Sequence, residues 1–150
     1  MTQYPILAID FGKKHFGTAI SDSKGIIASP LEVISITQKR GIEYILQRIS
    51  EICEEYKIKT ILLGIPQVFT EAHSKTPKAI MKFEKKLKEV LDLPIIFYDE
   101  SFSTTSAQNM LTSSGSNTKS SRKKIDKVSA AVFLQEFLNS SKINNDKKHN

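Results

Sequence analysis

One stretch near the N-terminus, residues 5–20 with the sequence PILAIDFGKKHFGTAI, decides the fold. Residues 5–11 form an apolar run that is too brief for a typical helix, and they predict a buried strand with Asp10 near its end. Residues 16–20 predict a second strand, and the tight connection through Gly12 favours an antiparallel hairpin. Residues 26–36 predict a third strand, in which Pro30 favours the edge of the sheet. The chain therefore opens with a three-strand antiparallel meander.

Beyond residue 41 the apolar residues recur at spacings of three and four, which is typical of amphipathic helices. The pattern predicts a helix over 42–56, a strand over 60–65, a helix from Pro77 to Leu91, a strand over 94–98, a helix over 103–113 and a last helix over 125–138. This alternation requires parallel strands with helical crossovers. The predicted fold class is α/β and ribonuclease-H-like: a mixed five-stranded sheet, made of the meander plus two parallel strands, with helices on both faces.

Composition limits the classes of protein to consider. The 150 residues are 39% hydrophobic, enough for one domain, which we place at residues 1–139 with a polar, disordered tail over 140–150. The formal charge of +6 favours polyanionic partners such as nucleic acid. A single cysteine excludes a disulfide framework, and three scattered histidines provide no paired metal ligands. No apolar run approaches the roughly 18 residues of a membrane span, so we expect a cytoplasmic protein without a membrane partner.

Acidic residues occur where two predicted apolar strands end and where the last helix begins. They are Asp10, the pair Asp99 and Glu100, and Asp126. Because strand side chains alternate between faces, only one of Asp99 and Glu100 can share the face of Asp10, and the pattern does not choose between them. Taken singly, Asp10 is typical of a turn, Glu100 of a solvated surface, and Asp126 of a helix N-terminus, where it is worth about 0.3 to 1 kcal/mol.

Taken together, three carboxylates at one sheet edge require neutralisation. Two of them 4 Å apart repel by roughly 4 kcal/mol at an effective dielectric constant of 20. Magnesium or manganese ions prefer oxygen ligands and would relieve this repulsion while keeping waters for substrate phosphate to displace. Such ions catalyse in-line phosphodiester hydrolysis in many nucleases. The acids therefore predict a metal-dependent nuclease.

Basic residues flank two of these acids. Lys13 and Lys14 follow Asp10, and five more surround Asp126: Lys119, Arg122, Lys123, Lys124 and Lys127. A charge run in isolation is typical of a solvated loop, but beside a carboxylate cluster it favours contacts with nucleic-acid phosphates. Among the remaining candidates, Cys53 lies on the apolar stripe of a helix and is interpreted as core. His73 is either an acid or base near the site or an exposed surface residue. Gly64 either lets the backbone or a substrate approach closely or, as the favoured interpretation, is a plain turn residue.

Four motifs in order resemble the YqgF family, which is described as Holliday junction resolvases or pre-16S rRNA nucleases. They lie at Ala8–Gly17 followed by Ser21-Asp22, at Leu63–Pro66, at Asp99–Thr104, and at Ser121–Ala131 followed by Leu134–Leu138. The resemblance implies the ribonuclease-H-like fold and selects Glu100 over Asp99 as the acid that joins Asp10 and Asp126 as metal ligands. Two features depart from the family: Ser101 replaces a usual Arg, and residues 67–74 replace a small-residue turn.

The resemblance implies a nuclease that uses Mg²⁺ or Mn²⁺ to process the 16S rRNA precursor during ribosome biogenesis, with pre-ribosomal particles as partners and either a monomer or a homodimer as the active form. One alternative is a resolvase-like nuclease acting on branched DNA, for which a dimer would cut two strands symmetrically. A second is a nucleotide-binding module, because the segment around Asp10 also resembles the first phosphate loop of actin-like and sugar-kinase proteins. A third is a non-catalytic RNA-binding assembly factor.

Overall fold

A computed structural model describes residues 2–65, 76–99 and 128–140 of the chain. Its elements are β1 (Ile6–Asp10), β2 (His15–Ser21), β3 (Ala28–Ser35), α1 (Ile42–Glu55), β4 (Thr60–Ile65), α3 (Thr76–Val90) and β5 (Ile95–Asp99). A final helix is described over residues 128–140. The predicted helix over 103–113, the start of the last predicted helix and the tail beyond residue 140 lie outside the described residues.

The strands form a five-stranded sheet in the order β3-β2-β1-β4-β5. The β1–β2 and β2–β3 pairs are antiparallel, whereas β4 runs parallel to both β1 and β5. The predicted mixed sheet, with a meander followed by two parallel strands, is confirmed. The edge position predicted from Pro30 is also confirmed, because β3 is an outer strand and Pro30 pairs with Ala19 beside a register shift.

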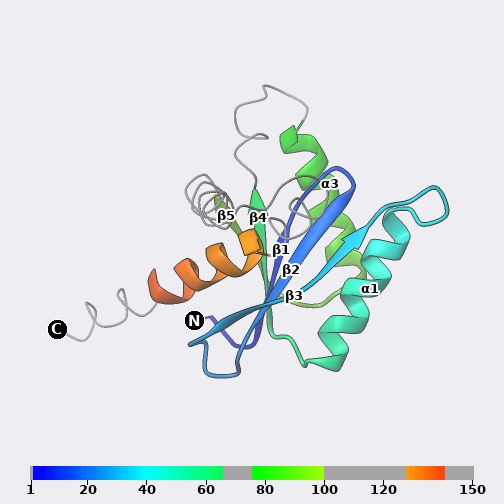
Figure 1. Cartoon of the computed structure of the whole chain (residues 1–150). Helices are drawn as coiled ribbons and strands as arrows, with labels where there is room; N and C mark the ends of the chain where they lie inside the picture. The colour runs from blue at the N-terminus through cyan, green and yellow to red at the C-terminus, as the bar shows by residue number, and fades with distance from the viewer. Residues whose placement is uncertain (1, 66–75, 100–127, 141–150) are drawn as a thin grey trace.

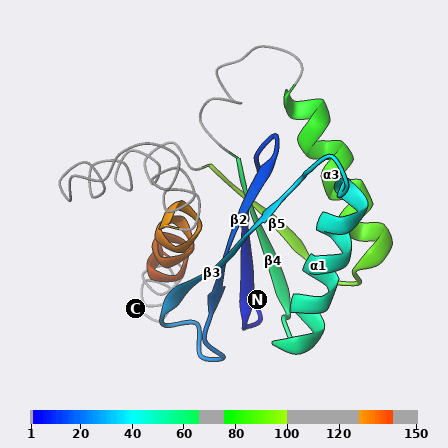
Figure 2. The same cartoon turned by 45° about the vertical axis from the view of Figure 1, so that its right-hand side comes forward.

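Helices cover both faces of this sheet, as predicted. Figures 1 and 2 show α1 and α3 together on one face and the helix over residues 128–140 on the other. Along β1, Leu7 and Ile9 belong to the hydrophobic cluster beneath α1 and α3, whereas Ile6 and Ala8 belong to the cluster beneath the final helix. The alternation therefore assigns Asp10, two residues after Ala8, to the face of the final helix.

Three phenylalanines pack together at the end of the first hairpin. The ring centroids of Phe11 and Phe16 are 5.6 Å apart, and Phe83 of α3 lies 5.4 Å from the first and 5.2 Å from the second. All three side chains are buried. Aromatic rings at these separations add to the stability given by burial alone. This cluster holds the residue after Asp10 against α3 and so anchors the end of β1.

A forked ion pair fixes α1 to the outer strand β3. The guanidinium of Arg48 donates from Nη2 to Glu32 Oε1 at 2.7 Å and from Nε to Glu32 Oε2 at 3.2 Å. Two parallel bonds of this kind orient both side chains.

Among the described residues, no helix has the length and apolar character needed to cross a bilayer.

We expect Phe83→Ala to lower the free energy of unfolding by about 3 to 5 kcal/mol, because it leaves a cavity among three packed rings. Phe97→Ala is a matched control, since the Phe97 side chain is 41% exposed and loses less contact. The measurement is urea unfolding followed by circular dichroism. Equal losses for the two variants would contradict the assigned packing.

Candidate active site

Asp10 is the last residue of β1 and is half-buried. Because β1, β4 and β5 are parallel neighbours, their carboxyl ends meet at one edge of the sheet. The backbone N–H of Phe11 donates to the carbonyl of Gly64 at 3.3 Å and carries the pairing one residue beyond β1. Ligands of open α/β sheets bind beyond the carboxyl ends of the strands. Asp10 therefore lies at the edge of the sheet where ligands of such folds bind.

Glycines stand on both sides of Asp10 in the sheet. Gly17 of β2 and Gly64 of β4 are its partners in the two neighbouring strands, and Tyr98 of β5 is in turn the partner of Gly64. Neither neighbouring strand therefore places a side chain directly beside the Asp10 carboxylate. The expectation that Gly64 is a turn residue is wrong, because Gly64 lies inside β4 and is buried there. In both neighbouring strands, the residue paired with Asp10 is therefore one without a side chain.

The other two predicted acids, Glu100 and Asp126, lie outside the described residues. Among residues 2–65, 76–99 and 128–140 there is no group of three or more His, Cys, Asp or Glu side chains that would hold a metal. The apolar stripe predicted to follow Asp126 is present in the described helix: Ala130 and Phe133 are fully buried, and Phe137 packs against the same cluster. The carboxylate cluster itself stays a prediction.

Of the predicted basic residues, Lys13 and Lys14 are described. Both are exposed in the turn between β1 and β2, at the same edge of the sheet as Asp10. The next residue, His15, places Nδ1 2.7 Å from Ser35 Oγ, which joins the start of β2 to the end of β3. Lys119, Arg122, Lys123, Lys124 and Lys127 lie outside the described residues, as does His73.

Cys53 belongs to the core. The side chain is buried in the cluster beneath α1 and α3, and desolvation raises the pKa of its thiol to about 12. A thiol with so high a pKa is almost wholly protonated near neutral pH and is a poor nucleophile. The core interpretation is confirmed by this burial.

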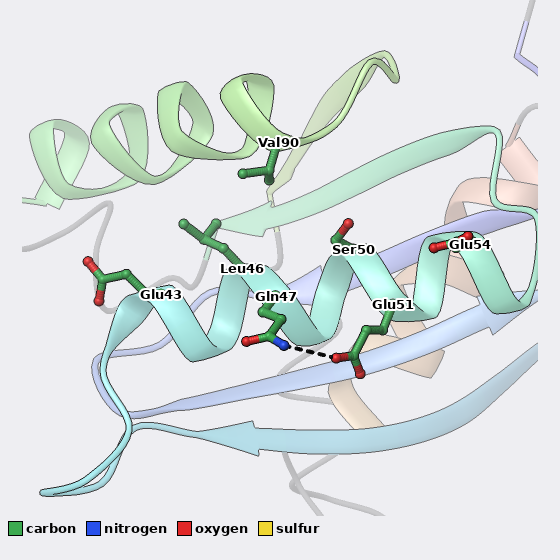
Figure 3. A pocket seen from close by; sticks show the side chains of 7 residues that line it. All are labelled: Glu43, Leu46, Gln47, Ser50, Glu51, Glu54 and Val90. Atoms are coloured by element: carbon green, nitrogen blue, oxygen red, sulfur yellow. Dashed lines mark hydrogen bonds between the residues drawn. The ribbon is translucent and has the colours of Figure 1, made fainter.

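A groove of about 360 Å³ lies between α1 and α3, on the face of the sheet opposite to Asp10. Figure 3 shows the side chains that line it, which are Glu43, Leu46, Gln47, Ser50, Glu51, Glu54 and Val90. Gln47 Nε2 donates to Glu51 Oε1 at 3.4 Å across one helical turn. Three carboxylates repel phosphate, so this groove is unsuited to a nucleic-acid backbone.

The strand order and the helices on both faces define a ribonuclease-H-like α/β protein. Residues 4–140 match the sequence profile of the RuvX family, described as Holliday junction resolvase. The chain belongs to this family, and the resemblance stated from its motifs is thereby confirmed.

Two relatives from Geobacillus carry the name "Putative pre-16S rRNA nuclease". The protein from Geobacillus kaustophilus is 39% identical over 136 residues, which cover 91% of this chain and 98% of the relative. The protein from Geobacillus sp. strain WCH70 is 38% identical over 135 residues, which cover 90% and 97%.

Two solved structures share the fold at low sequence identity. RuvC from T. thermophilus, in complex with a Holliday junction substrate, aligns with a TM-score of 0.54 at 16% identity, over 92% of this chain and 96% of that chain. The Holliday junction resolvase of fowlpox virus aligns with a TM-score of 0.53 at 15% identity, over 91% and 99%. Their similarity confirms the predicted fold class.

Sequence reasoning missed Gly17 and Tyr98 as neighbours of the site. Gly17 ends the first motif, and Tyr98 reads as an apolar strand residue. Their relation to Asp10 depends on strand register, because Gly17 pairs with Asp10 directly and Tyr98 is linked to Asp10 only through Gly64. The alternation of Ile96 and Tyr98 along the strand is visible in the sequence. It identifies Tyr98 as a neighbour of the site only when the register of β5 against β4 is known.

We expect the Cys53 thiol to resist 5,5′-dithiobis(2-nitrobenzoic acid) in the native protein at pH 8 and to react at once in 8 M urea, because its raised pKa and burial both suppress the thiolate. Absorbance at 412 nm measures the reaction. Fast labelling of the native protein would show that Cys53 is accessible and would contradict its assignment to the core.

Proposed function

We propose that the chain is a divalent-metal-dependent nuclease that hydrolyses phosphodiester bonds of structured nucleic acid, with the 16S rRNA precursor as its substrate. The observation that carries this proposal is Asp10, set between Gly17 and Gly64 at the carboxyl edge of three parallel strands. The names of the Geobacillus relatives support the choice of substrate.

In this proposal Asp10, Glu100 and Asp126 hold the metal. Support for Glu100 comes from the pleat of β5. Ile96 and Tyr98 belong to the cluster on the face of Asp10, so strand alternation gives position 100 the same parity and position 99 the opposite one. Support for Asp126 comes from sequence spacing, since it precedes the buried Ala130 by four residues, about one helical turn.

The chemistry of these donors fits Mg²⁺ or Mn²⁺, which bind carboxylate oxygens and retain several waters. When bound, such an ion supplies Lewis-acid activation of a water and neutralises charge at the scissile phosphate. The strand partners of Asp10, Gly17 and Gly64, have no side chains that would compete with such an ion for its carboxylate. Lys13 and Lys14, exposed at the same edge, contact flanking phosphates and set the position of the strand to be cut.

The second candidate substrate is a four-way DNA junction. The family description and the two resolvases that share this fold favour it. A junction has two symmetric strands to cut, so this substrate goes with a homodimer, whereas a single rRNA strand needs only a monomer. If the substrate is the 16S rRNA precursor, the protein acts on pre-ribosomal particles in the cytoplasm.

Cleavage of precursor 16S rRNA and of a four-way DNA junction, each in Mn²⁺, Mg²⁺ or EDTA, tests the proposal. We expect metal-dependent cutting of the rRNA precursor and a loss of at least about a hundredfold in Asp10→Asn, because the change removes one anionic metal ligand and even outer-shell changes cost 10- to 100-fold.

Asp22→Asn is the matched control for this substitution. Asp22 lies in the turn between β2 and β3, at the opposite edge of the sheet, where its Oδ1 accepts from the backbone N–H groups of Ile26 and Ile27 at 2.6 and 3.1 Å. An asparagine oxygen keeps these bonds, so activity should stay near that of the unmodified protein. Cutting by Asp10→Asn at the unmodified rate would refute the assigned site.

Lys13→Gln combined with Lys14→Gln should weaken RNA binding and lower the slope of log K against log salt concentration by about 1.4, or roughly 0.7 per lost phosphate contact on single strands. The measurement is fluorescence anisotropy in EDTA, where no cleavage occurs. Lys82→Gln combined with Lys85→Gln removes the same charge from exposed positions on α3. If both pairs lower the slope equally, the effect is net charge and not contact at the edge.

A further inference from the structure

One tyrosine at the end of β5 contacts three residues on one face of the final helix. The ring of Tyr98 stacks on Phe133 with centroids 5.5 Å apart and an interplanar angle of 17°, and it meets Phe137 edge-on at 6.4 Å. The Tyr98 hydroxyl donates to Glu136 Oε2 at 3.0 Å. Residues 133, 136 and 137 are three and four positions apart, so they share one helical face.

Tyr98 also stands in the same row of the sheet as Asp10. It pairs with Gly64, which pairs with Asp10, so two strand spacings of about 4.8 Å separate the two residues. Gly64 contributes no side chain between them. The attachment of the helix to β5 therefore lies at the level of the candidate metal ligand and on the same face of the sheet.

We propose that Tyr98 is a positioning residue for the metal site, because its ring and hydroxyl set where the final helix sits relative to Asp10. This inference rests on the proposed function, in which one carboxylate follows Tyr98 by two residues and another precedes the helix. Apolar burial is not directional, so the stacked rings fix the position of the helix on β5 less tightly than a hydrogen bond does. The hydrogen bond from Tyr98 to Glu136 adds the direction that the stack lacks.

A separate attachment holds the same helix at the opposite edge of the sheet. Gln135 Oε1 accepts from the backbone N–H of Ala28 at 2.9 Å, and Gln135 Nε2 donates to the carbonyl of Ile26 at 2.9 Å. These contacts lie where β3 begins, away from the carboxyl end of β1. Loss of the hydrogen bond between Tyr98 and Glu136 should therefore leave the helix docked through Gln135. It should loosen the contact between the helix and β5, which lies nearer to Asp10.

Precise placement matters because Mg²⁺ requires near-ideal octahedral ligands at about 2.0 to 2.1 Å. Tyr98→Phe keeps the stacked ring and removes only the hydroxyl. We expect this variant to bind Mn²⁺ about three- to tenfold more weakly, the equivalent of one lost hydrogen bond. The measurement is electron paramagnetic resonance of free Mn²⁺ in titrations of the full chain without nucleic acid, so it does not depend on cleavage.

Tyr44→Phe is the matched control. It also removes one tyrosine hydroxyl, which accepts from Arg40 Nη1 at 3.1 Å on α1, across the sheet from Asp10. Thermal unfolding should change little and to a similar extent in both variants, whereas only Tyr98→Phe should weaken Mn²⁺ binding. Equal Mn²⁺ affinity in Tyr98→Phe and the unmodified protein, or equal weakening in Tyr44→Phe, would overturn the inference.

Substitutions of Glu136 separate positioning from loss of charge. Glu136→Gln keeps an oxygen that accepts from the Tyr98 hydroxyl and should retain Mn²⁺ affinity, whereas Glu136→Ala should weaken Mn²⁺ binding as Tyr98→Phe does. In the double variant the two losses should be less than additive, because both changes remove the hydrogen bond between Tyr98 and Glu136. Additive losses would overturn the inference. If the unmodified protein binds no Mn²⁺, or Asp10→Asn binds it equally well, the proposed function fails as well.

Discussion

The parallel pairing of β1 with β4 is the constraint on which the rest of the structure depends. Ile6, Leu7, Ala8 and Ile9 are fully buried, because β1 lies at the centre of the sheet with helices on both faces. A strand covered on both faces must satisfy its backbone groups within the sheet. A slip of one residue in this register would move Asp10 to the face of α1 and α3 and bring an apolar side chain to the candidate site. Burial of β1 therefore determines the face of the sheet to which Asp10 belongs.

The two faces of the sheet have different tasks. The cluster beneath α1 and α3 is the larger, and its three phenylalanines hold the end of the first hairpin in place. The cluster beneath the final helix is smaller and includes Tyr98, whose polar end is bonded to Glu136. The first face is built from apolar contacts, while the other combines apolar packing with a hydrogen-bonded tyrosine and, in the proposed function, with the acid Asp10.

Charge is divided in the same way. Lys13 and Lys14 are exposed at the edge of the sheet where Asp10 lies, whereas three glutamates line the groove between α1 and α3. The two lysines attract a phosphate backbone, whereas the carboxylates of the groove repel one locally. This division agrees with membership of a family of nucleic-acid enzymes and with a site at the carboxyl ends of the parallel strands.

The sequence by itself determined the order and type of the described elements, because apolar spacing follows directly from which residues face the core. The predicted strand over 60–65 is β4 as observed, and the predicted helix over 42–56 ends within one residue of α1. The site was predictable only in part. Asp10 and the basic turn after it stood out as polar residues next to an apolar strand, Asp126 stood out at the start of an apolar helical stripe, and the family motifs chose Glu100 over Asp99. Only the tertiary structure decided that Gly17 and Gly64 flank Asp10 and that Tyr98 bonds to Glu136. These relations join residues far apart in the chain, and their register is set by burial of whole strands and helices, which no local pattern records.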